Sequence, residues 1–305
     1  MRNHDQLTRQ VYQEIHDRVA ADQDARDRML LMMEKESFGL EPDWFQDKVA
    51  LDAGCGNSGF TTNRLLNLGV RQVIALDIGD DWQDSFRHNL KMLRGGDDPR
   101  VSLRAGSTLD IPLPTQSCDF VVSNGVLLHL ETSAEAEVGF AECARVLAPE
   151  GHFYLSLSGS GGLLPGAIFP AIRRHYVENH EFRAFIDAIS PAEIHRMIDE
   201  MSEHSDRHGG GRFDTMMLKS LFGEDFCMFL KNKITAPTWY CNELTPQWCE
   251  TMYGQYGFTD VRRLNRFVVR SDIRRFFAPL HHAVDHPFAK ALYGHGVPLF
   301  VGRKL

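Results

Sequence analysis

Apolar residues recur with helical spacing near the N-terminus and form strand-like runs from residue 48 onward. Between residues 5 and 37 they return every three or four positions, which predicts two amphipathic helices. After Lys48, short runs rich in Val, Ile, Leu and Phe alternate with helical segments. The runs predict strands at 49–52, 72–77, 100–104, 119–123 and 152–157. Near-continuous apolar strands that alternate with helices are typical of a parallel sheet covered on both faces.

The regular alternation stops after Ser158. A long helical and aromatic stretch follows, in which Ser190-Pro191 has the composition of a helix start. Strand character returns at 258–270 and 298–303. The predicted fold is therefore a doubly wound α/β domain, with a mostly parallel seven-stranded sheet, N-terminal helices and a helical insertion after strand five. We expect a helical cap at 1–47, a Rossmann-like core at 48–158, a lid at 159–243 and completion of the sheet at 244–305.

Composition narrows the functions that this fold could carry. The 305 residues are 43% hydrophobic and 24% charged, with a net charge of −8 and no basic block, so nucleic acid is not an expected partner. The chain has no apolar run long enough to span a membrane, and its first residues do not resemble a signal peptide. The six cysteines form no CxxC pair, which favours reduced thiols in the cytoplasm and no metal site.

A glycine-rich turn follows the first predicted strand. Gly54, Gly56 and Gly59 have the spacing G-x-G-x-x-G, and a helix is expected from about Phe60. Glycines at these positions permit a tight turn, a close approach of ligand to backbone and close helix packing. Doubly wound sheets bind ligands at the carboxyl ends of their strands, so the turn is a candidate nucleotide site.

Two acidic residues flank this turn and narrow the choice of ligand. Asp77 ends the second predicted strand, at about the spacing where a carboxylate meets a ribose diol. Both features would also fit a nicotinamide dinucleotide. However, Asp52 precedes the first glycine by two residues and would repel a pyrophosphate at the helix N-terminus. A ligand with an ammonium and a sulfonium tolerates an acid there, which favours S-adenosylmethionine.

On these residues the chain resembles the class I S-adenosylmethionine-dependent methyltransferases. The matching segments, in order along the chain, are 51–56, 76–78, 106–113, 118–129, 144–151, 256–258 and 298–301. The resemblance implies that the cofactor is bound by Asp52, Gly54, Cys55, Gly56, Gly59, Asp77, Ile78, Asp110, Ile111, Asn124 and Tyr12. The chain departs from the pattern at Ser58, Glu150 and Leu128, and the insertion matches nothing in the family, which leaves the acceptor open.

His129 is the candidate catalytic residue, because it follows strand four beside the expected methyl position. Two roles stay open: a general base, or a side chain that shapes the pocket without proton transfer. Tyr12 and His16 share a helix face at i and i+4, and Tyr12 either closes over the methionine end of the cofactor or only packs. In the insertion, Arg173 and its neighbours either receive an anionic group or form a solvated helix face.

We therefore expect methyl transfer to oxygen or nitrogen of a small-molecule acceptor, since an acidic protein with an internal lid suits such acceptors. The alternative is a cyclase or lyase that acts on the aminopropyl arm of the cofactor and releases methylthioadenosine. A module that binds the cofactor without turnover and a nicotinamide-dependent oxidoreductase are further alternatives. The oligomeric state is open, with a homodimer as one option.

Overall fold

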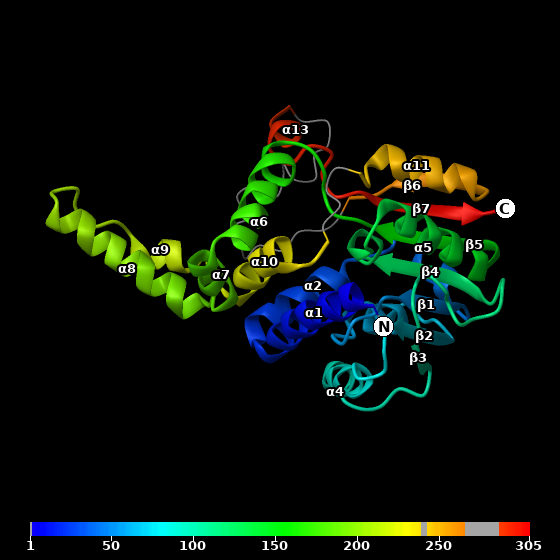
Figure 1. Ribbon diagram of the computed structural model, residues 1–305. Helices are drawn as coiled ribbons and strands as arrows, with labels where there is room; N and C mark the ends of the chain where they lie inside the picture. Colours follow the sequence, from blue (N-terminus) through cyan, green and yellow to red (C-terminus); the bar gives the residue numbers. More distant parts are fainter. Residues whose placement is uncertain (1, 239–242, 266–286) are drawn as a thin grey trace.

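Seven strands form one mixed sheet in the computed structural model, which describes residues 2–238, 243–265 and 287–305 (Figure 1). The strand order is β3-β2-β1-β4-β5-β7-β6; β1 to β5 are parallel, and β7 is antiparallel to both of its neighbours. The strands are β1 (Val49–Ala53), β2 (Gln72–Asp77), β3 (Val101–Ala105), β4 (Cys118–Asn124), β5 (Leu147–Ser156), β6 (Phe258–Arg263) and β7 (Leu299–Lys304). The predicted fold class is confirmed.

Helices cover both faces of the sheet because successive side chains of a strand point to opposite faces. In β1, Ala50 belongs to one apolar cluster and Leu51 to the other. The Leu51 face is covered by α5 (Ser133–Val146) and α11 (Pro246–Gln255). The Ala50 face is covered by α2 (Gln23–Glu34), α3 (Phe60–Asn67) and α4 (Gln83–Arg94). Burial on both faces explains why the strand sequences are almost continuously apolar.

The chain reverses its winding direction between β1 and β4. From β1 it proceeds to β2 and β3 on one side, and it then returns to β4 and β5 on the other. The connections on the two sides of this switch diverge and leave a crevice at the carboxyl ends of the strands. The glycine turn after β1 lies in this crevice, so the fold places the predicted site where such sheets bind ligands.

Strand β5 begins earlier than the predicted 152–157. Leu147 already pairs with Cys118 of β4, and the next pair is His152 with Phe120. The residues between Leu147 and His152 therefore bulge out of the ladder, and Glu150 adopts a positive φ of 65° there. The sequence around Pro149 indicated only a turn, because a bulge inside a strand has the same local composition.

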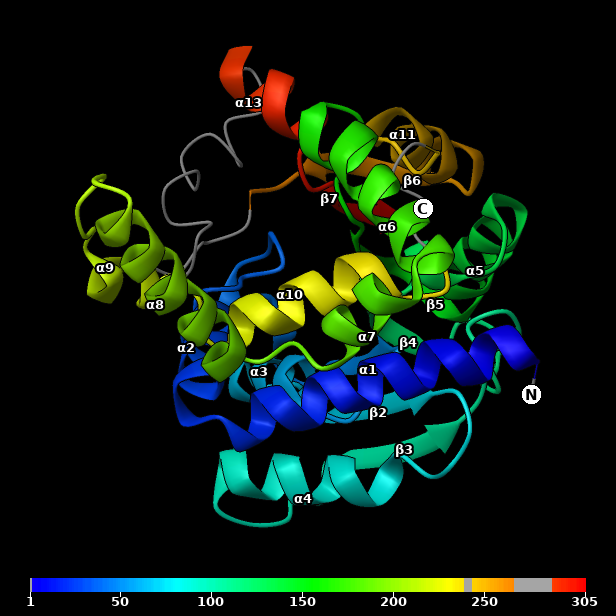
Figure 2. The same ribbon diagram turned by 60° about the vertical axis from the view of Figure 1, so that its left-hand side comes forward.

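The two N-terminal helices, α1 (Asn3–Ala21) and α2, lie across the carboxyl edge of the sheet, and α1 packs against both α2 and α10 (Glu224–Thr235) (Figure 2). Ile15 of α1 contacts Cys227 and Met228 of α10 in a small apolar cluster. The buried Lys231 of α10 also forms an ion pair with Glu14 of α1. Helices α1 and α2, together with α10, which is far from them in the sequence, thus form one cover over the crevice.

The insertion after β5 contains the π-helical turn η3 (Leu164–Ile168) and helices α6 (Phe169–Glu178), α7 (His180–Asp187), α8 (Pro191–Arg207), α9 (Thr215–Lys219) and α10. Ser190 caps α8 by accepting a hydrogen bond from the backbone N–H of Glu193, as its sequence predicted. Helices α8 and α9 extend away from the sheet, whereas α10 lies over the crevice (Figure 1). The remaining described helical segments are η1 (Pro42–Phe45), η2 (Leu127–His129) and α13 (Pro287–Tyr293).

Candidate active site

The turn after β1 requires glycine at its first two glycine positions. Gly54 and Gly56 have φ values of 84° and 59°, which L-residues adopt at a cost. A Cβ atom on Gly54 would lie 2.4 Å from a methyl carbon of Val126, and one on Gly56 would lie 2.4 Å from Cε1 of His16. The backbone N–H groups of Gly54 and Cys55 donate to the carbonyl oxygen of Leu76, at 2.8 and 3.0 Å. These bonds hold the turn against the end of β2.

Asp77 connects the end of β2 to this turn. Its Oδ2 accepts a hydrogen bond of 2.7 Å from the backbone N–H of Gly56, and its Oδ1 accepts one of 2.7 Å from Ile78. Burial raises the pKa of the Asp77 carboxyl, and the two backbone hydrogen bonds oppose that shift. Each carboxylate oxygen keeps the capacity to accept a second hydrogen bond. Asp77 can therefore still accept the hydroxyls of a ribose diol.

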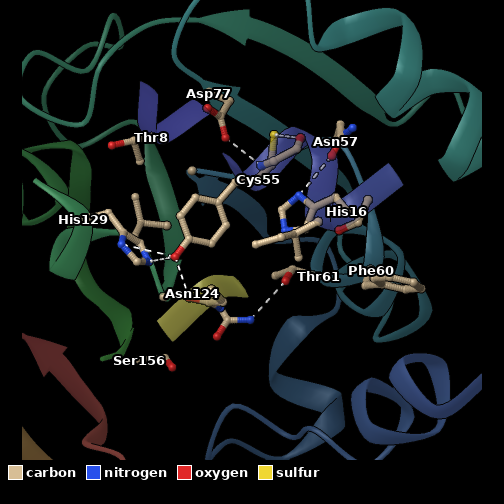
Figure 3. Close-up of a pocket in the computed structure, with 18 of the residues that line it drawn as sticks. Thr8, His16, Cys55, Asn57, Phe60, Thr61, Asp77, Asn124, His129 and Ser156 are labelled. Carbon is tan, nitrogen blue, oxygen red and sulfur yellow. Dashed lines mark hydrogen bonds between the residues drawn. The ribbon is translucent and has the colours of Figure 1, made fainter. Parts of the chain in front are cut away.

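A cavity of about 520 Å³ lies between the carboxyl ends of the strands and helices α1, α2 and α10 (Figure 3). Most of the predicted site residues come together in its wall: Tyr12, Gly54, Cys55, Gly56, Asp77, Ile78, Asn124 and His129. Burial raises the pKa of the Cys55 thiol well above its usual range, so the thiol stays protonated and is not a nucleophile.

Four predicted site residues are not in the wall of the cavity. Asp52 is 1% exposed and lies behind the turn, where its Oδ2 accepts a hydrogen bond of 2.7 Å from Thr62. Gly59 faces Leu90 of α4, which suits a packing role. Asp110 is exposed, and Ile111 is buried in the core, while the preceding segment 106–108 lines the cavity instead.

The environment of Asp52 also changes its charge. Burial raises the pKa of this carboxyl to about 7, and the hydrogen bond from Thr62 only partly opposes the shift. Asp52 is thus partly protonated near neutral pH. The sequence-based choice between a sulfonium and a pyrophosphate treated this residue as a full negative charge beside the ligand, which the structure does not support.

Tyr12, His129 and Asn232 form a hydrogen-bonded group at one side of the cavity. The hydroxyl of Tyr12 donates to Oδ1 of Asn232 at 2.7 Å and lies 2.6 Å from Nε2 of His129. On the other side of the ring, Nδ1 of His129 lies 3.3 Å from the carbonyl oxygen of Thr238, so both ring nitrogens have hydrogen-bond partners. Burial lowers the pKa of His129 to about 3. His129 is therefore a neutral side chain held in place by Tyr12.

His16 is fixed above the glycine turn by a second polar group. Its Nδ1 lies 3.0 Å from Oδ1 of Asn57, and the amide nitrogen of Asn57 donates to Asp17 at 2.6 Å (Figure 3). Burial lowers the pKa of His16, so its ring is neutral. The predicted shared helix face of Tyr12 and His16 is confirmed, and it points into the cavity.

Helix α10 supplies wall residues that sequence reasoning missed. Met228, Phe229, Asn232 and Lys233 all line the cavity, and Nζ of Lys233 donates to Ser158 Oγ at 3.0 Å. Their sequence has no motif that marks a site. Arg173, by contrast, donates to the carbonyl oxygens of Lys233 and Ala236, at 3.0 and 2.6 Å. Arg173 thus binds the C-terminal end of α10, a role that differs from both alternatives that the sequence left open, an anion site and a solvated helix face.

The glycine turn and the cavity fit the nucleoside that the sequence indicated. Gly54, Gly56 and Asp77 all line this cavity. The hydroxyl oxygen of Thr8 is buried in the cavity wall and has no hydrogen-bond partner among the described residues. A buried hydroxyl without a partner is unfavourable, so a polar ligand group would satisfy it.

Metal binding and membrane spanning have no support in the described part of the chain. Residues 2–238, 243–265 and 287–305 contain no group of three or more His, Cys, Asp or Glu that could hold a metal ion. None of the helices that the structure describes is both long and apolar enough to cross a bilayer. Five of the described cysteines are buried: Cys55, Cys118, Cys143, Cys227 and Cys249. Cys241 lies outside the described residues.

Comparison with known proteins identifies the domain that contains this site. Residues 51–155 match the family model described as methyltransferase domain. A protein of Mycolicibacterium smegmatis named Probable S-adenosylmethionine-dependent methyltransferase is 33% identical over 120 residues, which are 39% of this chain and 42% of the relative. A Mycobacterium tuberculosis protein of the same name, Rv3030, is 27% identical over 196 residues, or 62% of this chain and 66% of the relative. The alignments thus span less than two thirds of either relative.

One solved structure aligns with most of the chain. It is a chain of the complex between the Haloferax volcanii Trm112 methyltransferase activator and a candidate methyltransferase, with 15% identity and a TM-score of 0.49. The alignment covers 95% of this chain and 96% of that one. Because this match is loose, the assignment rests on the sequence matches. The chain carries an S-adenosylmethionine-dependent methyltransferase domain, and S-adenosylmethionine is the cofactor of that domain.

Proposed function

We propose that the protein transfers the methyl group of S-adenosylmethionine to an oxygen or nitrogen of a small-molecule acceptor. One observation carries the proposal: a single cavity joins the glycine turn and Asp77 to the Tyr12–His129–Asn232 group. The cavity is covered by α1, α2 and α10, and such concave sites suit small ligands rather than a flat macromolecular surface. The buried free thiols support the reducing cytoplasm as the compartment in which the protein acts.

Two sets of residues would hold the cofactor. Gly54 and Gly56 would contact the ligand from the wall of the cavity, and Asp77 would accept the ribose hydroxyls. Segment 106–108 lines the cavity on the β3 side, where the nucleobase would extend. When bound, the cofactor supplies a methyl group on a sulfonium, which is a good leaving group.

The chain's own contribution to the reaction is orientation. Displacement at a methyl carbon needs the attacking atom in line with the leaving group, and fixing that alignment can supply much of the rate. Tyr12, His129 and Asn232 are linked by hydrogen bonds of 2.6 and 2.7 Å, and Tyr12 and Asn232 come from α1 and α10, which are 220 positions apart at this contact. We assign His129 the role of a positioning residue that orients the Tyr12 hydroxyl, since both of its ring nitrogens already have hydrogen-bond partners.

Product analysis tests the proposal. The purified protein is incubated with S-adenosylmethionine and a library of small acids, alcohols, phenols and amines, and the nucleoside products are separated by chromatography. We expect S-adenosylhomocysteine in amounts equal to the methylated acceptor. Methylthioadenosine in its place would show chemistry on the aminopropyl arm and would contradict methyl transfer. An Asp77→Ala variant serves as the control for contaminating methyltransferases.

A further inference from the structure

The negative charges in the cavity wall are already neutralised or engaged. Among the lining residues that the structure describes, the carboxylates are Asp5 and Asp77. Asp5 pairs with Arg2 at 2.8 Å, and this pairing lowers the pKa of Asp5 although burial opposes it. Asp77 holds two backbone N–H groups beside the glycine turn. The described cavity wall therefore offers little negative charge that could pair with an ammonium group of an acceptor.

A lysine stands at the opposite end of the cavity from Asp77. Nζ of Lys233 donates to Oγ of Ser158, which follows the end of β5. In the strand order β2-β1-β4-β5, three strand spacings separate the ends of β2 and β5, on the order of 14 Å. Figure 3 shows Asp77 and Ser156, the last residue of β5, on opposite sides of the pocket. Lys233 thus lies away from the nucleoside half of the site, whereas Arg9, another cation of the same wall, pairs with Asp81 near Asp77.

Apolar side chains share the cavity wall with this lysine. Among them are Phe229 and Met228 of α10, and Leu157 and Val297. Nζ of Lys233 is 5.4 Å from the centroid of the Phe229 ring, a distance at which the ring face attracts a cation. Such an environment suits a ligand that combines one anionic group with a compact apolar body.

The same region lacks an effective proton acceptor in its described wall. Burial, with a smaller contribution from the positive charge of Lys233, lowers the pKa of His129 to about 3. Nε2 of His129 is engaged by the Tyr12 hydroxyl at 2.6 Å. A nucleophile that must lose a proton would thus receive little help from His129, whereas an anionic nucleophile needs none.

We infer that the methyl acceptor is a small carboxylic acid with an apolar body, whose carboxylate binds beside Lys233 and takes the methyl group as a methyl ester. This inference rests on the proposed methyl transfer. In the reaction, a carboxylate oxygen forms a bond to the methyl carbon while the methyl–sulfur bond breaks. The electron pair of that bond goes to sulfur, which becomes a neutral thioether, and no proton is released.

Binding of matched probes tests the inference independently of turnover. Protein saturated with S-adenosylhomocysteine is titrated by calorimetry with phenylacetate, 2-phenylethanol and 2-phenylethylamine, which share a body and differ in the head group. We expect phenylacetate to bind at least tenfold more tightly than the other two. Lys233→Gln should abolish that preference without changing the affinity for S-adenosylhomocysteine, and Lys233→Arg should retain it.

Lys219→Gln is the matched control, because Lys219 lies on α9 outside the cavity wall and pairs with Asp199. It should bind the three probes as the wild type does. A turnover arm uses radiolabelled S-adenosylmethionine with the same probes, and we expect label in a product that releases methanol in alkali. Lys233→Gln should raise the KM for phenylacetate much more than it lowers kcat.

Three results would overturn the inference: no binding of phenylacetate, equal or tighter binding of the alcohol or amine, or an unchanged preference in Lys233→Gln. Methylation of an alcohol or amine in preference to the acid would also overturn it while leaving the proposed methyl transfer intact. Failure of the wild type to bind S-adenosylhomocysteine would instead remove the proposed function, and the inference with it.

Discussion

The hydroxyl oxygen of Tyr12 lies 2.6 Å from Nε2 of His129, and the two ring centroids are 4.5 Å apart. Tyr12 comes from α1 and His129 from the segment after β4, which are 117 positions apart in the sequence. The pair therefore forms only when α1 covers the carboxyl edge of the sheet. Packing of α1 on the sheet therefore closes the cavity and orients the Tyr12 hydroxyl at the same time.

Tyr12 and His129 should act as a unit in turnover. Tyr12→Phe and His129→Ala should each lower kcat by about 10- to 100-fold, because a misplaced group loses alignment. The double variant should be about as slow as the worse single variant, since the second change removes a contact that is already lost. Steady-state kinetics on the three variants measures this coupling. Multiplied single effects in the double variant would show that the two side chains act separately.

Turnover should show no ionisation of His129 near neutral pH. Burial lowers the pKa of His129 to about 3, so the ring stays neutral throughout the range from pH 5 to 9. The pH profile of kcat should therefore have the same shape in the wild type and in His129→Gln. A limb in the wild-type profile near pH 6.5 that disappears in His129→Gln would instead assign His129 the role of general base.

Gly56→Ala should lower the free energy of unfolding more than alanine at another glycine that also has a positive φ but has open space at its Cβ position. A Cβ at Gly56 would lie 2.4 Å from the His16 ring, whereas Gly95, with φ of 75°, has no heavy atom within 4 Å of its Cβ position. Gly95→Ala should cost about 1 kcal/mol of the free energy of unfolding from backbone strain alone. Gly56→Ala should cost more, as measured by chemical denaturation.

His16→Ala provides the internal check on that steric explanation. In the Gly56→Ala background it should restore part of the lost stability, because it removes the atoms that the new Cβ would contact. The backbone strain at φ of 59° would remain. No recovery in the double variant would contradict the steric account.

Asp52→Asn should stabilise the protein increasingly as the pH rises from 4 to 7. The folded state raises the pKa of Asp52 from 3.8 to about 7, so in this window the unfolded chain has released a proton that the folded chain still holds. Stability of the wild type therefore falls with rising pH, and the loss is complete above pH 7. Asparagine removes this dependence and still accepts the hydrogen bond from Thr62.

Thermal melts at pH 5 and pH 8 measure the effect. The melting temperature of Asp52→Asn should exceed that of the wild type by a larger margin at pH 8, with a gain of about 1 kcal/mol or more. Asp97→Asn, an exposed residue on the surface, should show no such change. An equal margin at both pH values would mean that Asp52 ionises as it does in the unfolded chain.

The glycine turn and Asp77 could be predicted because their signals are local. Gly54 and Gly56 indicate a positive φ from their own residue type. Asp77 ends strand β2, which the apolar residues before it predict. Helix capping at Ser190 was predictable for the same reason. The order of strands and helices followed from the same kind of periodicity.

The acceptor end of the cavity could not be predicted, because it depends on tertiary packing. Asn232 and Lys233 enter the wall only because α10 packs on α1, and the pair Glu14–Lys231 that joins these helices is separated by 217 positions. The position of Asp110 outside the cavity wall also depends on how the chain folds locally. The short bridge between Ser107 and Asp110 turns the chain there, so segment 106–108 faces the cavity while Asp110 faces solvent.

The central claim is that the turn after β1, together with Asp77, binds the nucleoside of S-adenosylmethionine. Isothermal titration calorimetry of S-adenosylhomocysteine into the wild type, Asp77→Ala and the exposed control Asp84→Ala tests it most directly. We predict one site in the wild type, an unchanged site in Asp84→Ala, and weakening by about 1–3 kcal/mol in Asp77→Ala. No heat with folded wild-type protein, or equal affinity in Asp77→Ala, would contradict the account.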